Sequence, residues 1–232
     1  MQEGFGTKPG FVLDELANKH PKRINLGRGL VFHYRVSRPK RMAYGEAPVL
    51  KSMMSGLLWE GGQIIGALIM TRYNVEHCYD DQAFIWAMDA EDEHQYQLAR
   101  TITNAWNAVH DLADCGGTII TIEGVWIDQR CGGRALLSRC LPRISTVVFP
   151  DFCVLVFKAR PLEELSEGAM ARRTRALMRL YQRMGAKTLP GDAGDEGWMW
   201  APRPFWYIPE PSSEPLQDGK HLCQTKEVDL YC

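Results

Sequence analysis

Apolar residues in the first half of the chain follow the runs and alternations of β-strands. Gly29–Val36 is rich in β-forming residues and predicts one strand. Leu57–Trp59 and Gln63–Met70 flank Glu60-Gly61-Gly62, and because glycine tolerates the positive φ of tight turns, the arrangement predicts a β-hairpin. The aromatic residues within Tyr79–Met88 predict a further extended segment.

From Asp89 onward the apolar spacing becomes helical, and two long amphipathic helices are predicted. The first begins among acidic residues, which favour a helix N-terminus, and ends at Cys115-Gly116-Gly117. The second has a basic outer face and is closed by Gly185. Their apolar stripes are Leu98, Ile102, Trp106, Val109 and Leu112, and Leu177, Leu180, Tyr181 and Met184. Shorter helices are predicted over Phe11–Lys19 and over Ala135–Cys140, each ended by a proline.

Three further strands are predicted between and after these helices: Thr118–Ile127, Phe152–Phe157 and Trp198–Trp200. Since strands come first and then alternate with helices, the fold class is α/β or α+β around one mixed sheet flanked by helices. Residues 1–201 form one predicted domain. Residues 202–232 are rich in proline and aromatic residues and predict an irregular, extended tail.

Composition narrows the class of protein. The net charge of −1 over 232 residues gives no bulk electrostatic reason to expect a nucleic-acid or membrane partner. The most apolar stretch, Ile64–Met70, is too short to cross a bilayer, and no targeting segment is visible, so a cytoplasmic protein is expected. The seven cysteines are scattered and include no Cys-x-x-Cys pair, so neither a disulfide framework nor a metal site is expected.

The candidate chemistry lies at Arg130-Cys131-Gly132-Gly133-Arg134-Ala135, between a predicted strand and a predicted helix. Free N–H groups of a first helical turn can hold a phosphate, and glycines let it lie on the backbone. The alternative is a tight turn that needs glycine only for its dihedral angles. The nucleoside-triphosphate and dinucleotide motifs are absent, which leaves a short loop suited to the pyrophosphate of coenzyme A.

These residues resemble the acyl-CoA loop, Arg/Gln-x-x-Gly-x-Gly/Ala, of the GNAT superfamily of N-acyltransferases. A register that begins at Gln129 would put Arg134 where a small residue belongs, so Arg130 is preferred as the first position. A second motif, Leu180-Tyr181-Gln182-Arg183-Met184-Gly185-Ala186, resembles the family's Leu-Tyr-x-x-x-Gly-Phe. The chain departs from the family at Asp128-Gln129, where apolar residues are usual, and in its tail.

The resemblance implies an acetyl-CoA-dependent N-acetyltransferase in which an amine of a small molecule, peptide or protein attacks the thioester directly. It implies that a backbone N–H in Val125–Ile127 polarises the thioester and that Tyr181 protonates the departing thiolate. The alternative for Tyr181 is a purely structural place in the apolar stripe. The cofactor-binding residues implied are Val125, Trp126, Ile127, Arg130, Cys131, Gly132, Gly133, Arg134 and Ala135.

Glu123 is the candidate base because it interrupts an apolar strand, where an unpaired carboxylate is expensive to bury. Strand alternation places Glu123 on the same face as Val125 and Ile127, opposite Ile122, Gly124 and Trp126. The alternative is a solvated or salt-bridged glutamate. The weaker candidates for this role are His33, His77 and His110.

A second function class stays open: a catalytically inactive protein of the same fold that acts by binding a partner. The basic loop Arg35–Arg41, the arginines of residues 172–183 and the aromatic segment Trp198–Tyr207 would be its surfaces. That aromatic segment could equally pack the tail, cover a substrate groove or form a homodimer contact. The identity of the acceptor does not follow from the sequence.

Overall fold

A computed structural model describes residues 20–42, 49–75, 81–106, 117–131, 133–161 and 165–203 of the chain. The predicted helix Phe11–Lys19, the tail beyond residue 203, and His77 and His110 lie outside the described residues, as does Gly132 of the candidate loop. No helix in the described ranges is long and apolar enough to span a membrane.

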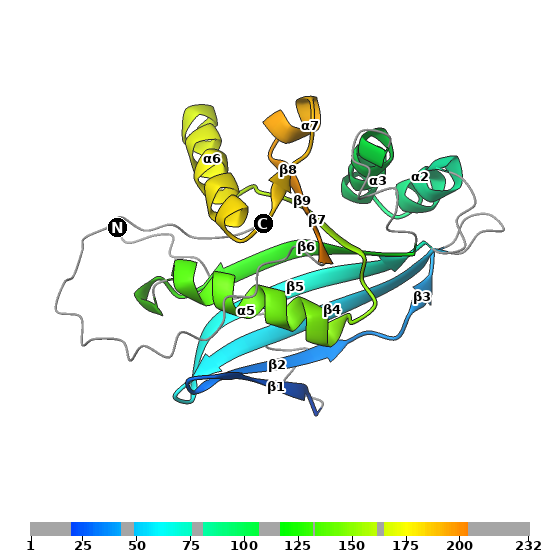
Figure 1. The fold of residues 1–232 in the computed structure, drawn as a ribbon. Coiled ribbons are helices and arrows are strands. Elements are labelled where there is room, and N and C mark those ends of the chain that lie inside the picture. Colours follow the sequence, from blue (N-terminus) through cyan, green and yellow to red (C-terminus); the bar gives the residue numbers. More distant parts are fainter. Residues whose placement is uncertain are drawn as a thin grey trace, which may run out of the picture.

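One mixed sheet of nine strands organises the described chain (Figure 1). Its order is β1-β2-β4-β5-β6-β7-β9-β8, with β3 paired to β4. All neighbours are antiparallel except β6 and β7. The strands are β1 Lys22–Gly27, β2 Leu30–Val36, β3 Lys40–Arg41, β4 Leu50–Glu60, β5 Gln63–Asn74, β6 Thr118–Ile127, β7 Val154–Lys158, β8 Lys187–Thr188 and β9 Trp198–Pro202. The predicted mixed sheet is therefore confirmed.

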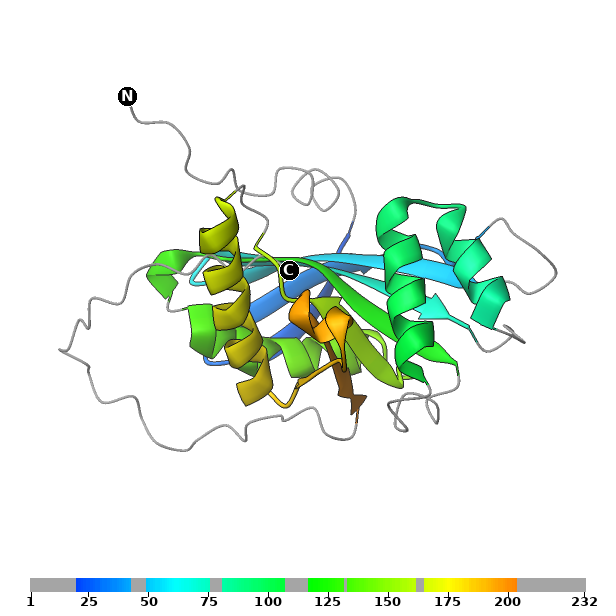
Figure 2. The same ribbon diagram turned by 90° about the horizontal axis from the view of Figure 1, so that it is seen from above.

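Helices complete the fold. They are α2 Asp81–Asp89, α3 Glu93–Trp106, α5 Gly133–Val148, α6 Glu167–Arg183 and the short α7 Asp192–Asp195, with a 3-10 turn η1 Gln129–Cys131. In both views α6 lies on the opposite side of the molecule from the α2–α3 pair (Figures 1 and 2). α5 and α6 bury Leu137, Leu141 and Leu177 in one core cluster, whereas α2 and α3 bury Phe84 and Leu98 in another.

The hairpin prediction is confirmed: β4 and β5 flank a turn in which Gly61 has φ 55° and Gly62 φ 82°. Three predicted strands are also present, as β2, β6 and β9, and a fourth begins two residues later than predicted, as β7. The short strands β1, β3 and β8 were not predicted. Two have only two residues each, too few to show a hydrophobic period.

Two element predictions were wrong. Tyr79–Met88 does not form an extended segment: its described part belongs to α2, where Phe84, Ala87 and Met88 are buried at helical spacing. The second error concerns Pro142, which does not end the helix that begins the candidate loop. α5 continues through it to Val148.

Packing explains why α5 tolerates an interior proline. A proline inside a helix costs about 3 kcal/mol because it removes one backbone hydrogen bond and crowds the preceding turn. Leu137, Leu141 and Ile144 are all at most 3% exposed, and each fully buried side chain of this kind contributes about 1.5–3 kcal/mol. Burial on both sides of Pro142 therefore outweighs the proline.

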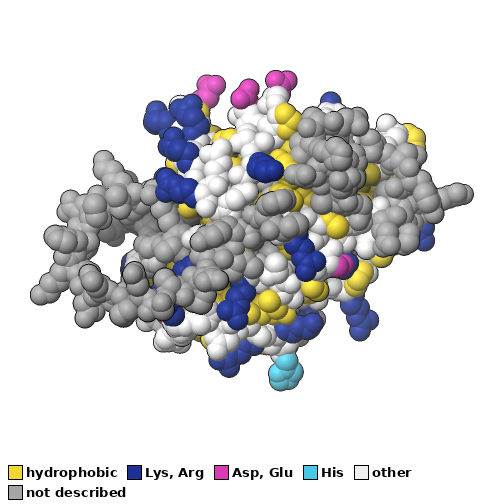
Figure 3. All heavy atoms as spheres, viewed as in Figure 1, with side chains coloured by type: hydrophobic (Ala, Val, Ile, Leu, Met, Phe, Trp, Pro, Cys, Tyr) yellow, Lys and Arg dark blue, Asp and Glu magenta, His cyan; other side chains and the backbone are white. Residues whose placement is uncertain are grey.

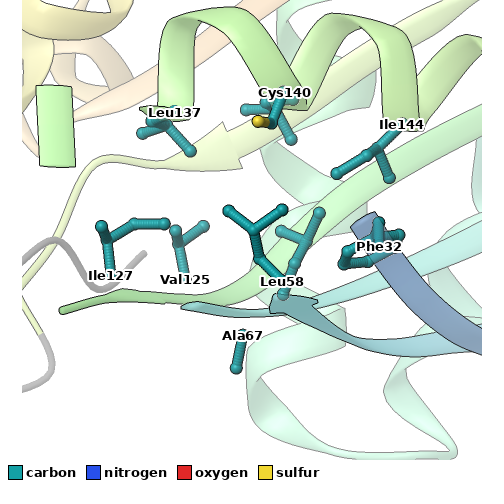
Figure 4. A pocket seen from close by; sticks show the side chains of 10 residues that line it. Phe32, Leu58, Ala67, Val125, Ile127, Leu137, Cys140 and Ile144 are labelled. Carbon is teal, nitrogen blue, oxygen red and sulfur yellow. The ribbon is translucent and has the colours of Figure 1, made fainter. Parts of the chain in front are cut away.

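Beneath α5 lies a small apolar cavity, of about 20 Å³. Figure 4 shows Leu137, Cys140 and Ile144 of α5 above it and Leu58 and Val125 of the sheet below. A space of this size holds at most one water molecule, which would find no strong polar partners there. Burial raises the pKa of the Cys140 thiol to about 11, so this cavity is part of the core and not a reactive site.

Candidate active site

The central feature of the site is a divergence of β6 from β7. The two strands pair in parallel only between Ile119–Thr121 and Val154–Val156. β6 then continues to Ile127, still paired with β5 on its other side. The second half of β6 therefore presents one backbone edge that is not paired to β7.

The register with β5 shows which backbone groups lie on that edge. The N–H of Asp128 donates to the carbonyl of Ile65, with N···O 2.8 Å, on the β5 side. Because successive residues of an antiparallel strand point their N–H groups to alternate sides, the N–H groups of Ile127 and Val125 point away from β5. The structure thus places both groups at the open edge, in the segment where the sequence placed the thioester contact.

Glu123 is the extra residue of a β-bulge in β6. Ile69 pairs with Gly124 and Met70 pairs with Ile122, so Glu123 has no partner on β5. Because of this bulge, the predicted assignment of Glu123 to the same face as Val125 and Ile127 is wrong. Ile122 lies in the same core cluster as Val125 and Ile127, beneath α5, and the Glu123 carboxylate contacts α3 instead. Regular alternation cannot foresee this because a bulge shifts the faces by one residue.

The Glu123 carboxylate has two partners. Thr121 donates its hydroxyl to Oε1, with O···O 2.5 Å, and Nε2 of His94 lies 3.4 Å from Oε2. Burial opposes ionisation of the carboxyl, but the hydrogen bonds from His94 and Thr121 and the charge of His94 outweigh it and lower the pKa of Glu123. Glu123 is therefore a charged, paired carboxylate at neutral pH.

His94, in the first turn of α3, is the residue that sequence reasoning missed. Its imidazole stacks against Trp198 with ring centroids 6.4 Å apart, and its side chain is 59% exposed. The hydrogen bond to Glu123 is the main cause that raises the pKa of His94. No local motif marks His94, because its partner follows 29 positions later, beyond the helix that His94 begins.

Tyr73 lies behind this pair and was also not predicted. It is 1% exposed, and burial and the negative charge of Glu123 raise the pKa of its hydroxyl. Its hydroxyl therefore stays protonated at neutral pH, in the part of β5 that pairs with the start of β6.

The pair makes stability depend on pH. The lowered pKa of Glu123 means that its stabilising contribution is present above the ordinary value of 4.5 and is lost as the pH falls through the lowered pKa. The raised pKa of His94 means that its contribution is present below 6.5 and is lost as the pH rises through the raised pKa. We expect the melting temperature of the wild type to exceed that of His94→Gln most between pH 4.5 and 6.5. A difference that does not vary with pH would contradict the pairing.

A polar groove lies between α3 and α7, with a volume of about 410 Å³. Glu196 at its edge binds Lys158, with Nζ···Oε2 2.8 Å, and Lys158 lies over the ring of Trp198 that stacks on His94. Through Lys158 and Trp198, the edge of the groove is connected by side-chain contacts to His94. Its polar lining consists of Gln97, Arg100, Thr101, Asn104, Asp192 and Glu196.

The candidate anion loop has the predicted order of strand, turn and helix: β6 is followed by η1, and α5 begins at Gly133. The side chains of Arg134 and Ala135 lie outside the described part of the structure. The guanidinium of Arg130 is bound to Asp128 through Nε, 3.1 Å from Oδ1, and Nη2, 2.6 Å from Oδ2. Asp128 thus holds the arginine that was expected to meet a phosphate.

If this loop holds the pyrophosphate that the resemblance implies, Asp128→Asn is expected to strengthen the binding of coenzyme A. The change removes one negative charge beside the loop, worth about 1 kcal/mol or roughly fivefold in Kd, and frees Arg130. Asparagine keeps the oxygen that accepts from the Arg130 backbone N–H, so η1 should persist. Isothermal calorimetry measures the Kd, with the exposed Asp195→Asn as a charge-matched control far along the chain. Unchanged or weaker binding of coenzyme A by Asp128→Asn would show that Asp128 does not compete with phosphate for Arg130.

The Cys131 thiol is poorly activated as a nucleophile. Its burial, reinforced by the charges of Asp128 and Glu60, raises the pKa of the thiol. The thiol is therefore protonated at neutral pH, which disfavours transfer through an acyl-cysteine.

Tyr181 occupies the core. It is 0% exposed in the same cluster as Leu177, Leu180 and Met184, which confirms the predicted stripe. Its ring lies 4.5 Å from that of Phe157 in β7. The structure thus brings Tyr181 to the strand that diverges from β6, in a buried position.

Trp126 lies on the opposite face of the sheet from Val125 and Ile127, in a small cluster with Leu57 and Ala67. By the same alternation as for Val125 and Ile127, the N–H of Trp126 points toward β5, so neither its side chain nor its N–H faces the open edge. Among the described residues no group of three or more His, Cys, Asp or Glu side chains could hold a metal ion. Comparisons with protein-family models, with curated proteins and with solved structures find no match for this chain.

Proposed function

We propose that this protein is an N-acetyltransferase that uses acetyl-CoA to modify an amine. The observation that carries the proposal is the edge of β6 beyond Thr121, where the N–H groups of Val125 and Ile127 face the divergence from β7. A helix starts directly after this edge and offers its N–H groups to a pyrophosphate. The resemblance to GNAT acyltransferases at Arg130–Ala135 and Leu180–Ala186 agrees with this arrangement.

The residues present fit acetyl-CoA, which when bound supplies an activated thioester. Val125 or Ile127 would donate its N–H to the thioester oxygen and stabilise the charge that develops there. The first turn of α5, with Arg130 once released from Asp128, would hold the pyrophosphate. Gly132–Ala135 would contribute backbone to the same loop.

The His94–Glu123 pair would remove the proton from the attacking amine. Nε2 of His94 lies 3.4 Å from Glu123 and the ring is 59% exposed, so Nδ1 would be the atom that receives the proton of an acceptor amine. Glu123 would orient the imidazole and stabilise its protonated form. The amine nitrogen would then form the new bond to the acyl carbon as the bond from carbon to sulfur breaks. The resemblance assigns the proton for the departing thiolate to Tyr181, whose side chain is 0% exposed here and would have to meet the thiolate from within the core.

The acceptor would enter along the α3–α7 groove. Carboxylates of Asp192 and Glu196 line it, together with the polar side chains of Gln97 and Asn104. These groups suit an ammonium-bearing acceptor.

Calorimetric titration with acetyl-CoA tests the proposal directly, with uptake by the wild type as the expected result. The combination Arg130→Glu and Gly133→Trp should abolish binding and leave the circular dichroism spectrum unchanged. If the wild type binds neither acetyl-CoA nor coenzyme A, the proposal fails.

A second candidate is a protein with this fold that binds a partner and catalyses nothing. The closed Asp128–Arg130 pair favours it, because it lowers the affinity of the loop for phosphate. This alternative predicts a biological activity that survives Tyr181→Phe and Glu123→Gln.

A further inference from the structure

The outer face of α6 carries a straight row of arginines, which we call the α6 ridge: Arg172, Arg175, Arg179 and Arg183. All four are exposed, and Figure 3 shows basic side chains gathered over α6. Their spacing of three, four and four residues keeps them on one helix face, over about 16 Å of helix length.

The ridge is electrostatically unbalanced. No position three or four residues from any of the four arginines is acidic, and no ion pair among the described residues involves them. Like charges at these spacings destabilise a helix, so each neighbouring pair in the row opposes the formation of α6. An anionic partner that binds the row would remove this repulsion.

The other face of α6 is committed to the core. Leu177, Leu180, Tyr181 and Met184 are buried against the sheet, so the helix cannot turn over or insert its apolar side into a lipid surface. The ridge is therefore held rigidly and presents only charge. This excludes the mode by which amphipathic helices bind membranes.

The chemistry of the row favours phosphate. The ridge contains arginine only and no lysine. Guanidinium groups bind phosphate through two parallel hydrogen bonds, which a lysine cannot do. Four such groups in line match a polymer of phosphates better than a single small anion.

We propose that the α6 ridge binds the phosphate backbone of a nucleic acid. The near-neutral net charge of the chain conceals this surface, because charge concentrated along one helix acts locally. Recognition is through phosphates and independent of base sequence. The inference does not depend on acetyl transfer.

The test is fluorescence anisotropy of the full chain with a labelled single-stranded RNA of 20 nucleotides, with duplex DNA of equal length as a second probe. Four phosphate contacts predict a log–log salt slope of about −2.8 for the single strand, or about 50-fold weaker binding at 200 mM than at 50 mM salt. Arg175→Gln/Arg179→Gln should reduce the slope by about 1.4. The matched control, Lys22→Gln/Arg23→Gln, removes two exposed charges from β1 and should leave binding unchanged.

Folding and cofactor binding are measured on the same variants. Because the ridge repels itself, Arg175→Gln/Arg179→Gln should melt at the wild-type temperature or above it, so loss of binding cannot be ascribed to unfolding. Absence of RNA and DNA binding at 50 mM salt, or equal weakening by both double variants, overturns the proposal. So does a ridge variant that binds RNA normally but coenzyme A, or vesicles of phosphatidylserine, more weakly than the wild type.

Discussion

Glu123→Gln is expected to lower the rate of acetyl transfer by about 100- to 10,000-fold, the usual contribution of a positioned acid–base group. The amide keeps the size of the side chain and loses the charge that holds His94. Steady-state kinetics with saturating acetyl-CoA measure the effect as a fall in kcat. Binding of acetyl-CoA should not change, since Glu123 faces α3 and not the candidate loop.

The pH profile distinguishes the roles of the two residues. If His94 takes the proton, the wild-type rate rises as the pH passes the raised pKa of His94. Glu123→Gln removes the main cause of that rise in pKa, so the midpoint should move to lower pH while the plateau falls. His94→Gln should then lower kcat by as much as Glu123→Gln does. Full activity of His94→Gln would show that Glu123 itself is the base, and an unshifted midpoint would show that the two groups are not coupled.

Gly56→Ala is expected to destabilise the fold by about 3 kcal/mol, at the upper end of the cost of overpacking a core. A Cβ at Gly56 would lie 2.1 Å from Cζ of Phe32, whose side chain is 0% exposed. For a protein of this size the loss corresponds to a fall of about 6–12 °C in Tm, measurable by calorimetry.

A double-mutant cycle isolates the contact. Phe32→Leu replaces the ring with a smaller side chain and should restore part of the stability lost by Gly56→Ala. The effects of the two substitutions on stability should therefore not add. The control is Gly124→Ala in β6, where a Cβ would meet no atom within 4 Å and little change is expected. Additive costs in the cycle would show that the ring moves away from the added methyl group.

Local pattern was sufficient for much of the fold and for part of the site. Thr118–Ile127 is a strand because its β-branched run is buried on both faces for most of its length, and the bounds predicted are those observed. The stripe from Leu177 to Met184 could be predicted because three buried positions at helical spacing lie within α6 and the fourth, Met184, is its C-cap. The order of strand, loop and helix at Arg130 follows from the same kind of local signal.

Local pattern gave wrong predictions where packing between distant segments determines the structure. Pro142 is tolerated because Leu141 and Ile144 are buried by the sheet, which the helix sequence does not contain. The face of the sheet on which Glu123 lies depends on its register with Ile69 and Met70 of β5.

The Asp128–Arg130 pair is different, because its members are two residues apart and the pair could have been predicted from the sequence.

The sequence by itself thus determined the strand–loop–helix segment at Thr118–Ala135, the apolar stripe of α6 and the class of the sheet, because each is encoded by spacing within one element. Only the tertiary structure decided that β7 leaves β6 after Thr121, that Val125 and Ile127 face the resulting edge, and that His94 meets Glu123. These depend on contacts between residues far apart in the chain. Their geometry is set by how the elements bury one another, which no local period records.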